Sequence, residues 1–135
     1  MIIDVFCHHI SKPVGKLMDK KSKYYGNTPG KQYPYPAQNA DPEVRLGLMD
    51  KYGIDVQAIS QTTPVLMGFG AEDAAEICRV SNDDNYALCK AYPKRFVNIC
   101  MISLFDMKSA LKELERSVDK LDCRGVPVSS NQNGK

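Results

Sequence analysis

The pattern of apolar and polar positions predicts four short strands with helices between them. Residues 1–6 are dense in β-branched and aromatic side chains, as in a buried strand. Residues 54–60 alternate with period two, residues 96–104 form a near-continuous apolar run, and residues 125–129 are the last strand candidate. Strands that alternate with helices in this way predict an α/β fold with a parallel sheet built from β–α units.

Three helices are predicted between these strands. The first runs from Asp41, a good N-cap, to Gly53, a good left-handed stop. The second covers residues 71–92 and ends before Pro93, although the polar residues 81–85 leave open a break in its middle. The third begins at Asp106 and has an amphipathic stripe at steps of four and three, made of Met107, Leu111, Leu114, Val118 and Leu121.

The length of 135 residues fits one compact domain. Four strands and three helices could form a small open sheet, but they also equal the first half of a (β/α)8 TIM barrel of roughly 250 residues. We favour the half barrel, because the edge of an open parallel sheet would need a cover. Residues 11–40 are rich in glycine, proline and lysine and are expected to form a long inserted loop, with a short helix near residues 14–21.

The charge balance of the chain limits the classes of partner that we expect. Eighteen basic and sixteen acidic residues are interspersed and give a net charge of +2, so neither nucleic acid nor a membrane is an expected partner. The first ten residues do not resemble a secretory signal, and five scattered cysteines favour reduced thiols, so we expect a cytoplasmic protein. Cys78 and Cys89, eleven residues apart, are expected to pack on one helix face rather than to bind metal.

Candidate chemistry gathers where the predicted strands end, which is where α/β folds place their active sites. Strand alternation directs Phe6 and His8 to one side of the sheet, and Cys7 and His9 to the other. His8 could bind a transition metal if other strands supply further ligands, or it could be a hydrogen-bonded core residue. Arg45, beside the apolar stripe of the first helix, is expected to lie at the surface.

Two polar residues at the same end are candidate substrate-binding groups. Thr62 follows the second predicted strand, and Asn133 follows the fourth. Thr62 could instead serve a turn or a cap, and Asn133 could belong to a frayed terminus. No catalytic residue is assigned from the pattern.

Several segments carry a family resemblance. The chain resembles, in order and nearly in spacing, the aminocarboxymuconate-semialdehyde decarboxylase group of the amidohydrolase superfamily at residues 41–45, 49–50, 53, 56–60, 64–65, 82–83, 92–97, 114–116 and 124–126. The resemblance implies that residues 1–135 are the N-terminal part of one metal-dependent barrel, usually with zinc. It also implies a decarboxylase or hydrolase acting on a small unsaturated or aromatic carboxylic acid. The resemblance further implies that the chain associates either with further copies of itself, as a homo-oligomer, or with a missing C-terminal half of the barrel.

One position departs from the family pattern. The family's first strand carries two histidine ligands separated by one residue; the second matches His8, but Phe6 occupies the first. A divalent metal, zinc by resemblance, would therefore lack one ligand, unless a bulge brings Cys7 or His9 into the site. We expect the isolated chain to be inactive. The alternative is a non-catalytic or metal-free relative that binds a small acid or a partner chain.

Overall fold

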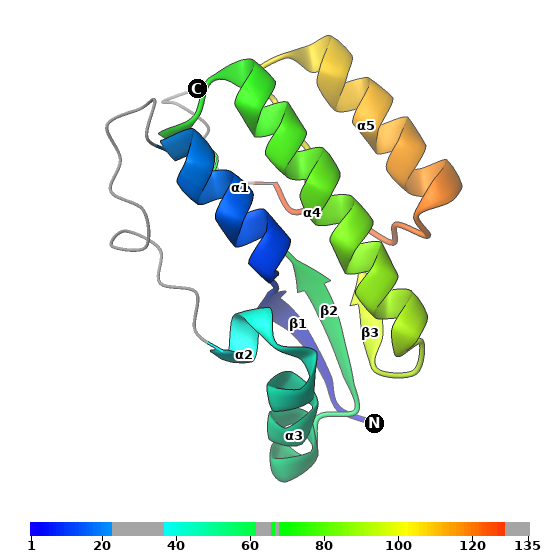
Figure 1. Ribbon diagram of the computed structural model, residues 1–135. Helices are drawn as coiled ribbons and strands as arrows, with labels where there is room; N and C mark the ends of the chain where they lie inside the picture. Colours follow the sequence, from blue (N-terminus) through cyan, green and yellow to red (C-terminus); the bar gives the residue numbers. More distant parts are fainter. Residues whose placement is uncertain (23–36, 62–65, 67, 129–135) are drawn as a thin grey trace.

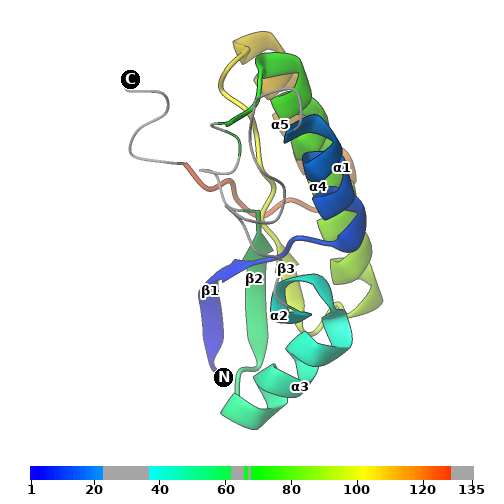
Figure 2. The ribbon, with the colours of Figure 1, turned by 60° about the vertical axis from the view of Figure 1, so that its left-hand side comes forward.

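The computed structural model describes residues 1–22, 37–61, 66 and 68–128 of the chain. Its sheet has three parallel strands in the order β1 (Ile3–His8), β2 (Val56–Ser60) and β3 (Phe96–Asn98). The helices are α1 (Lys12–Ser22), α2 (Ala37–Ala40), α3 (Pro42–Tyr52), α4 (Ala71–Ala91) and α5 (Met107–Lys120). Figures 1 and 2 show these helices on one side of the sheet, while the opposite face of β1 and β2 carries no described helix.

Local signals place the helix ends as the sequence predicts. The Asp41 side chain accepts hydrogen bonds from the backbone N–H of Glu43 (3.0 Å) and Val44 (3.5 Å), and α3 stops at Gly53, whose φ is 68°. Asp106 caps α5 by accepting from the Ser109 N–H at 2.9 Å. These residues satisfy backbone donors that a helix leaves unpaired at its start.

Two strand predictions and one helix break differ from the structure. β3 has three residues rather than nine, and residues 125–128 are not a strand, although the Arg124 N–H donates to the Asn98 carbonyl (2.9 Å) beside β3. Helix α4 is unbroken across residues 81–85, because Asn82 and Asn85 are buried against the rest of the fold rather than competing for the helix backbone. Residues 12–22 of the expected loop form helix α1, and residues 23–36 lie outside the described part of the chain.

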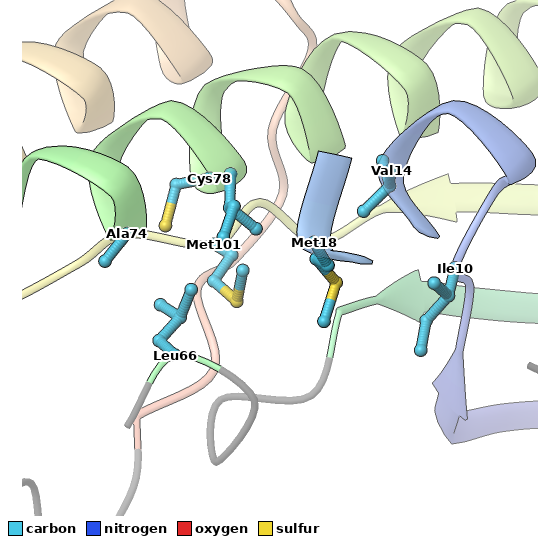
Figure 3. Close-up of a cluster of buried hydrophobic side chains, with 8 residues drawn as sticks. Ile10, Val14, Met18, Leu66, Ala74, Cys78 and Met101 are labelled. Carbon is cyan, nitrogen blue, oxygen red and sulfur yellow. The ribbon is translucent and has the colours of Figure 1, made fainter. Parts of the chain in front are cut away.

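The buried apolar residues form two clusters between the sheet and its helices. Figure 3 shows the first cluster, in which α1, α4 and Leu66 meet the segment after β3. Its members are Ile10, Val14, Met18, Leu66, Ala74, Ile77, Cys78 and Met101. The second lies nearer α3 and contains Cys7, Met49, Ile59, Leu88 and Phe96, with Cys89 packed against it. Cys78 and Cys89 therefore pack among apolar residues, as the sequence predicts.

Helix α5 exposes most of the apolar stripe that was expected to face the core. An amphipathic stripe ordinarily faces the core, yet Met107, Leu111 and Val118 are 57%, 58% and 56% exposed. The buried side of α5 carries the small residues Ala110 and Ser117. Among the helices that the structure describes, none is long and apolar enough to cross a bilayer.

Candidate functional site at the carboxyl ends of the strands

Strand β1 contains a bulge just before its polar end. Asp4 lies opposite Gln57 and Cys7 opposite Ile59, so three steps along β1 match two steps along β2. The extra residue places Asp4 and Cys7 on the same side of the sheet, the side that faces the helices. Phe6 and His8 share the other side, as alternation predicts, and their rings make an edge contact with centroids 4.9 Å apart.

The His8 side chain is partly buried at the carboxyl end of β1. Burial lowers the pKa of its imidazole below the ordinary value, and the nearby Arg45 guanidinium adds to this effect, while the Ser60 backbone and Asp4 act in the opposite direction. The neutral imidazole is therefore favoured at neutral pH. This is the form that can bind a metal ion or accept a hydrogen bond.

Arg45 is buried, with 5% of its surface exposed, and the expected surface role is wrong. Its Nη1 donates to Gln57 Oε1 at 2.9 Å, and its Nη2 donates to the backbone carbonyl of His8. Gln57 in turn donates from Nε2 to Asp4 Oδ2 at 3.0 Å. This chain of polar groups holds the end of β1 to β2 and α3, and so positions His8.

The inward face of α3 explains why the sequence reasoning missed Arg45. Arg45 and Met49 are the buried residues of this helix, whereas Val44 and Leu48, which the pattern places with Met49 and Tyr52 on one apolar face, are 42% and 38% exposed. The position of Arg45 one turn before the fully buried Met49 was the available signal. That spacing was outweighed by the apolar residues Val44 and Leu48, which precede Arg45 and Met49 by one residue and predict a different buried face.

His9 points away from His8 and contacts helix α4. Its side chain is buried, and Nε2 lies 3.7 Å from Asp84 Oδ2. Burial opposes ionisation of Asp84, but the His9 and Ser11 side chains outweigh it and hold the pKa of this carboxyl below its ordinary value. The contact between His9 and Asp84 ties the end of β1 to α4, which no sequence pattern indicated.

The bulge does not bring the Cys7 thiol to the side of the sheet that carries His8. Its thiol donates to the Ala58 carbonyl at 3.1 Å. Burial, helped by Asp4, raises the pKa of Cys7 to about 12, so the metal-binding thiolate is scarce at neutral pH. Neither Cys7 nor His9 replaces the ligand that the family has at Phe6.

The residues of this part of the chain do not by themselves fit a complete metal site. Phe6 is 82% exposed on the side of His8 and has no donor atom. Within the described residues there is no group of three or more histidine, cysteine or acidic side chains that could hold a metal ion. A zinc site needs three or four protein ligands, and His8 would supply one. The other two candidates, Thr62 and Asn133, lie outside the described residues.

Comparison with known proteins identifies the family of the chain. The amidohydrolase family model Amidohydro_2 matches residues 3–135. The chain belongs to this family. Among its curated relatives, 2-amino-3-carboxymuconate-6-semialdehyde decarboxylase from Dictyostelium discoideum is 32% identical over 97 residues, which are 70% of this chain. Gamma-resorcylate decarboxylase from Rhizobium radiobacter is 33% identical over 64% of this chain. The chain spans 27% of the length of each of these two proteins.

Solved structures establish the fold of this amidohydrolase. The 5-carboxyvanillate decarboxylase of Sphingomonas paucimobilis matches 98% of this chain and 43% of its own with a TM-score of 0.81, at 24% identity. A dihydroxybenzoic acid decarboxylase from Polaromonas sp. JS666, solved with manganese and 2-nitroresorcinol, matches 93% of this chain and 37% of its own, with a TM-score of 0.72 and 27% identity. The chain therefore has an α/β fold that corresponds to the first part of a TIM barrel.

Proposed function

We propose that this chain forms the N-terminal part of an amidohydrolase-type decarboxylase for a small aromatic or unsaturated carboxylic acid. The observation that carries the proposal is the match to decarboxylases: the two curated relatives described above are both named as decarboxylases. A 2,6-dihydroxybenzoate decarboxylase solved with 2,6-dihydroxybenzoate is 26% identical over 100% of this chain, with a TM-score of 0.69. The substrate class follows from these names and not from a pocket in this chain.

His8 is the residue we assign to the site. It lies at the strand end where barrel enzymes hold their reacting groups, and Arg45 fixes its backbone through the His8 carbonyl. We propose His8 as one ligand of a divalent metal ion, either zinc, which the sequence resemblance implies, or manganese, which a solved relative holds. Thr62 and Asn133 remain proposed substrate-binding residues.

A second candidate function rests on Phe6. An apolar ring in contact with His8, at the position of a family ligand, suits a metal-free relative that binds a small acid without turning it over. The two candidates differ in whether His8 binds a metal. They also differ in whether replacing Phe6 with a ligand improves binding.

Metal binding by two variants tests the proposal. Phe6 is exposed, so Phe6→His should preserve the fold while adding a donor next to His8. We expect Phe6→His to bind Mn²⁺ or Zn²⁺ at least about tenfold more tightly than the parent chain, a gain of about 1.4 kcal/mol. Isothermal titration calorimetry and metal analysis of the purified chain would measure this, with Val5→His, on the same strand, as the matched control.

The double variant Phe6→His/His8→Ala should lose the gain. If His8→Ala leaves metal binding unchanged both in the parent chain and in Phe6→His, the metal-dependent enzyme is contradicted and the metal-free relative is favoured. We also expect the 135-residue chain to release no CO2 from 2,6-dihydroxybenzoate, with or without added metal, because the described residues contain no group of three or more side chains that could hold a metal ion. Metal-dependent release of CO2 would overturn that expectation.

A further inference from the structure

The ring of Phe6 is exposed beside His8 on the open side of the sheet. Phe6 is 82% exposed, and the described helices all lie on the other side (Figure 2). Its ring meets the His8 ring at an edge, with the centroids 4.9 Å apart and the ring planes at 73° to each other. This contact occupies at most one face of the Phe6 ring, so the opposite face is open to a ligand.

Hydrogen bonds hold the backbone that carries this ring. The Phe6 N–H donates to Asp4 Oδ1 at 3.1 Å, and the Gln57 side chain donates to Asp4 Oδ2 at 3.0 Å. Arg45 donates to the carbonyl of His8. The strand is therefore fixed on both sides of Phe6, and a ring that is already held in place loses little freedom when it binds a ligand.

We propose that Phe6 binds the aromatic ring of the acid by stacking, and that it is the specificity-determining residue that favours aromatic over saturated acids. The inference rests on the proposed function for the general class of ligand, a small acid at the strand end that carries His8. It narrows that class to aromatic acids. It also gives a role to the residue by which the first strand departs from the family pattern, since a ring without a donor atom still offers a face to another ring.

Stacking and simple apolar burial predict different preferences among acids. Aromatic and saturated six-membered rings cover similar apolar areas, and burial is favourable in proportion to that area. Only an aromatic ring can also pair with Phe6 in an offset-stacked or edge-to-face arrangement, which stabilises the contact beyond the area that it buries. A preference for the aromatic acid at equal charge and similar size is therefore the signature of stacking.

The test is an NMR titration of the full, reduced chain with benzoate and, separately, with cyclohexanecarboxylate, in the presence of a metal chelator. The chain carries ¹³C-labelled phenylalanine, and the Phe6 ring signal is the one that is missing from Phe6→Leu. We expect benzoate to shift this signal and to bind about fivefold more tightly than cyclohexanecarboxylate. Equal or tighter binding of cyclohexanecarboxylate, or shifts confined to the other phenylalanines, would overturn the proposal.

Three variants assign the preference to the ring of Phe6. Phe6→Leu should fold normally at this exposed position and lose the preference for benzoate, whereas Phe6→Tyr keeps a ring and should retain it. Val5→Ala is the matched control, because Val5 is 77% exposed on the same strand but has no ring, and it should also retain the preference. A preference that survives Phe6→Leu would contradict the assignment.

The same proteins distinguish the other roles of an exposed ring. If Phe6→Leu lowers self-association in analytical ultracentrifugation and benzoate shows no preference in the parent chain, the ring serves a contact between copies, and the proposal is overturned. The metal titrations test the proposed function separately, because the benzoate titration contains a chelator. An aromatic preference without metal binding that depends on His8 would support the stacking role of Phe6 and contradict the metal-dependent enzyme, and the reverse result would do the opposite.

Discussion

The buried side chain of Asn82 connects α4 to the segment after β3 and to α5. Its Oδ1 accepts from the Met101 N–H at 2.7 Å, and its Nδ2 donates to the Met101 carbonyl at 2.8 Å and to Glu113 Oε1 at 2.8 Å. Asn82 is fully buried, so no water can replace these bonds. A polar residue in the middle of a helix thus completes the backbone bonding of the segment after β3.

Asn82→Ala should lower the free energy of unfolding by about 2 kcal/mol, because it leaves buried backbone groups of Met101 without partners. Urea unfolding followed by circular dichroism would measure the loss. Asn85→Ala is the matched control, since Asn85 is equally buried on the same helix but its Nδ2 has no partner in the described structure. An equal loss in both variants would show that the hydrogen bonds of Asn82 contribute little.

Helix α5 shows how an element can be predicted while its orientation is not. The stripe at Met107, Leu111 and Val118 is exposed, because Ser117 and Glu113 on another face meet Asn82 of α4. Burying that polar contact requires a small side chain where the helices approach. The orientation of α5 therefore follows from its neighbour and not from its own hydrophobic stripe.

A pair of substitutions compares an exposed leucine of the α5 stripe with Leu121, the buried leucine of the same stripe at the C-cap of α5. Leu111→Gln should change the free energy of unfolding by less than about 0.5 kcal/mol, because Leu111 is mostly exposed. Leu121→Ala, at a buried leucine, should cost about 2–4 kcal/mol. Chemical denaturation of both variants would measure the difference. A large loss for Leu111→Gln would mean that the stripe is covered in solution.

The N-cap of α5 makes one part of stability depend on pH. Hydrogen bonds from Ser109 hold the pKa of Asp106 below its ordinary value of 3.8. The stabilisation is therefore present above pH 3.8 and is lost as the pH falls through the lower, folded-state pKa. Asp106→Asn keeps a capping oxygen without a titrating group. Urea midpoints of the two proteins should converge as the pH falls from 5 to about 2, and parallel curves would contradict this.

At the scale of the whole molecule, the open face of the sheet is the main exposed apolar surface of β1. Ile3, Val5 and Phe6 are 49%, 77% and 82% exposed, on a sheet whose described helices all lie on the other side (Figure 2). Large contiguous apolar patches are rare on soluble monomers. Among the described residues, this face of β1 is therefore an apolar surface that we expect another segment or chain to cover.

Fluorescent dye binding can test this surface. We expect the chain to bind 8-anilinonaphthalene-1-sulfonate in its native state, and the double variant Val5→Ser/Phe6→Ser to reduce the fluorescence at least about twofold without a loss of helical signal. Tyr52→Ser, at a 65% exposed aromatic residue on α3, is the control and should change it little. Unchanged dye binding in the double variant would place the exposed apolar surface elsewhere.

The amino-acid pattern alone was enough to predict the three strands of the sheet, the helices α3, α4 and α5, the caps at Asp41, Gly53 and Asp106, and the shared side of Phe6 and His8. Each of these depends on residues a few positions apart, whose hydrogen bonds and side-chain directions are set locally. The family resemblance also identified the amidohydrolase family from short segments. Thr62 and Asn133 remain predictions.

Four features became visible in the fold alone: the burial of Arg45, the contact of His9 with Asp84, the exposed residues of the α5 stripe, and the backbone pairing of residues 124–125 with residues 98–100. Each joins segments that lie far apart along the chain, and the pattern around either residue alone does not reveal the other. The bulge in β1 is of the same kind, since it is defined by the register against β2. These long-range contacts determine where His8 lies, because Arg45 from α3 and Ser60 from β2 hold the end of its strand.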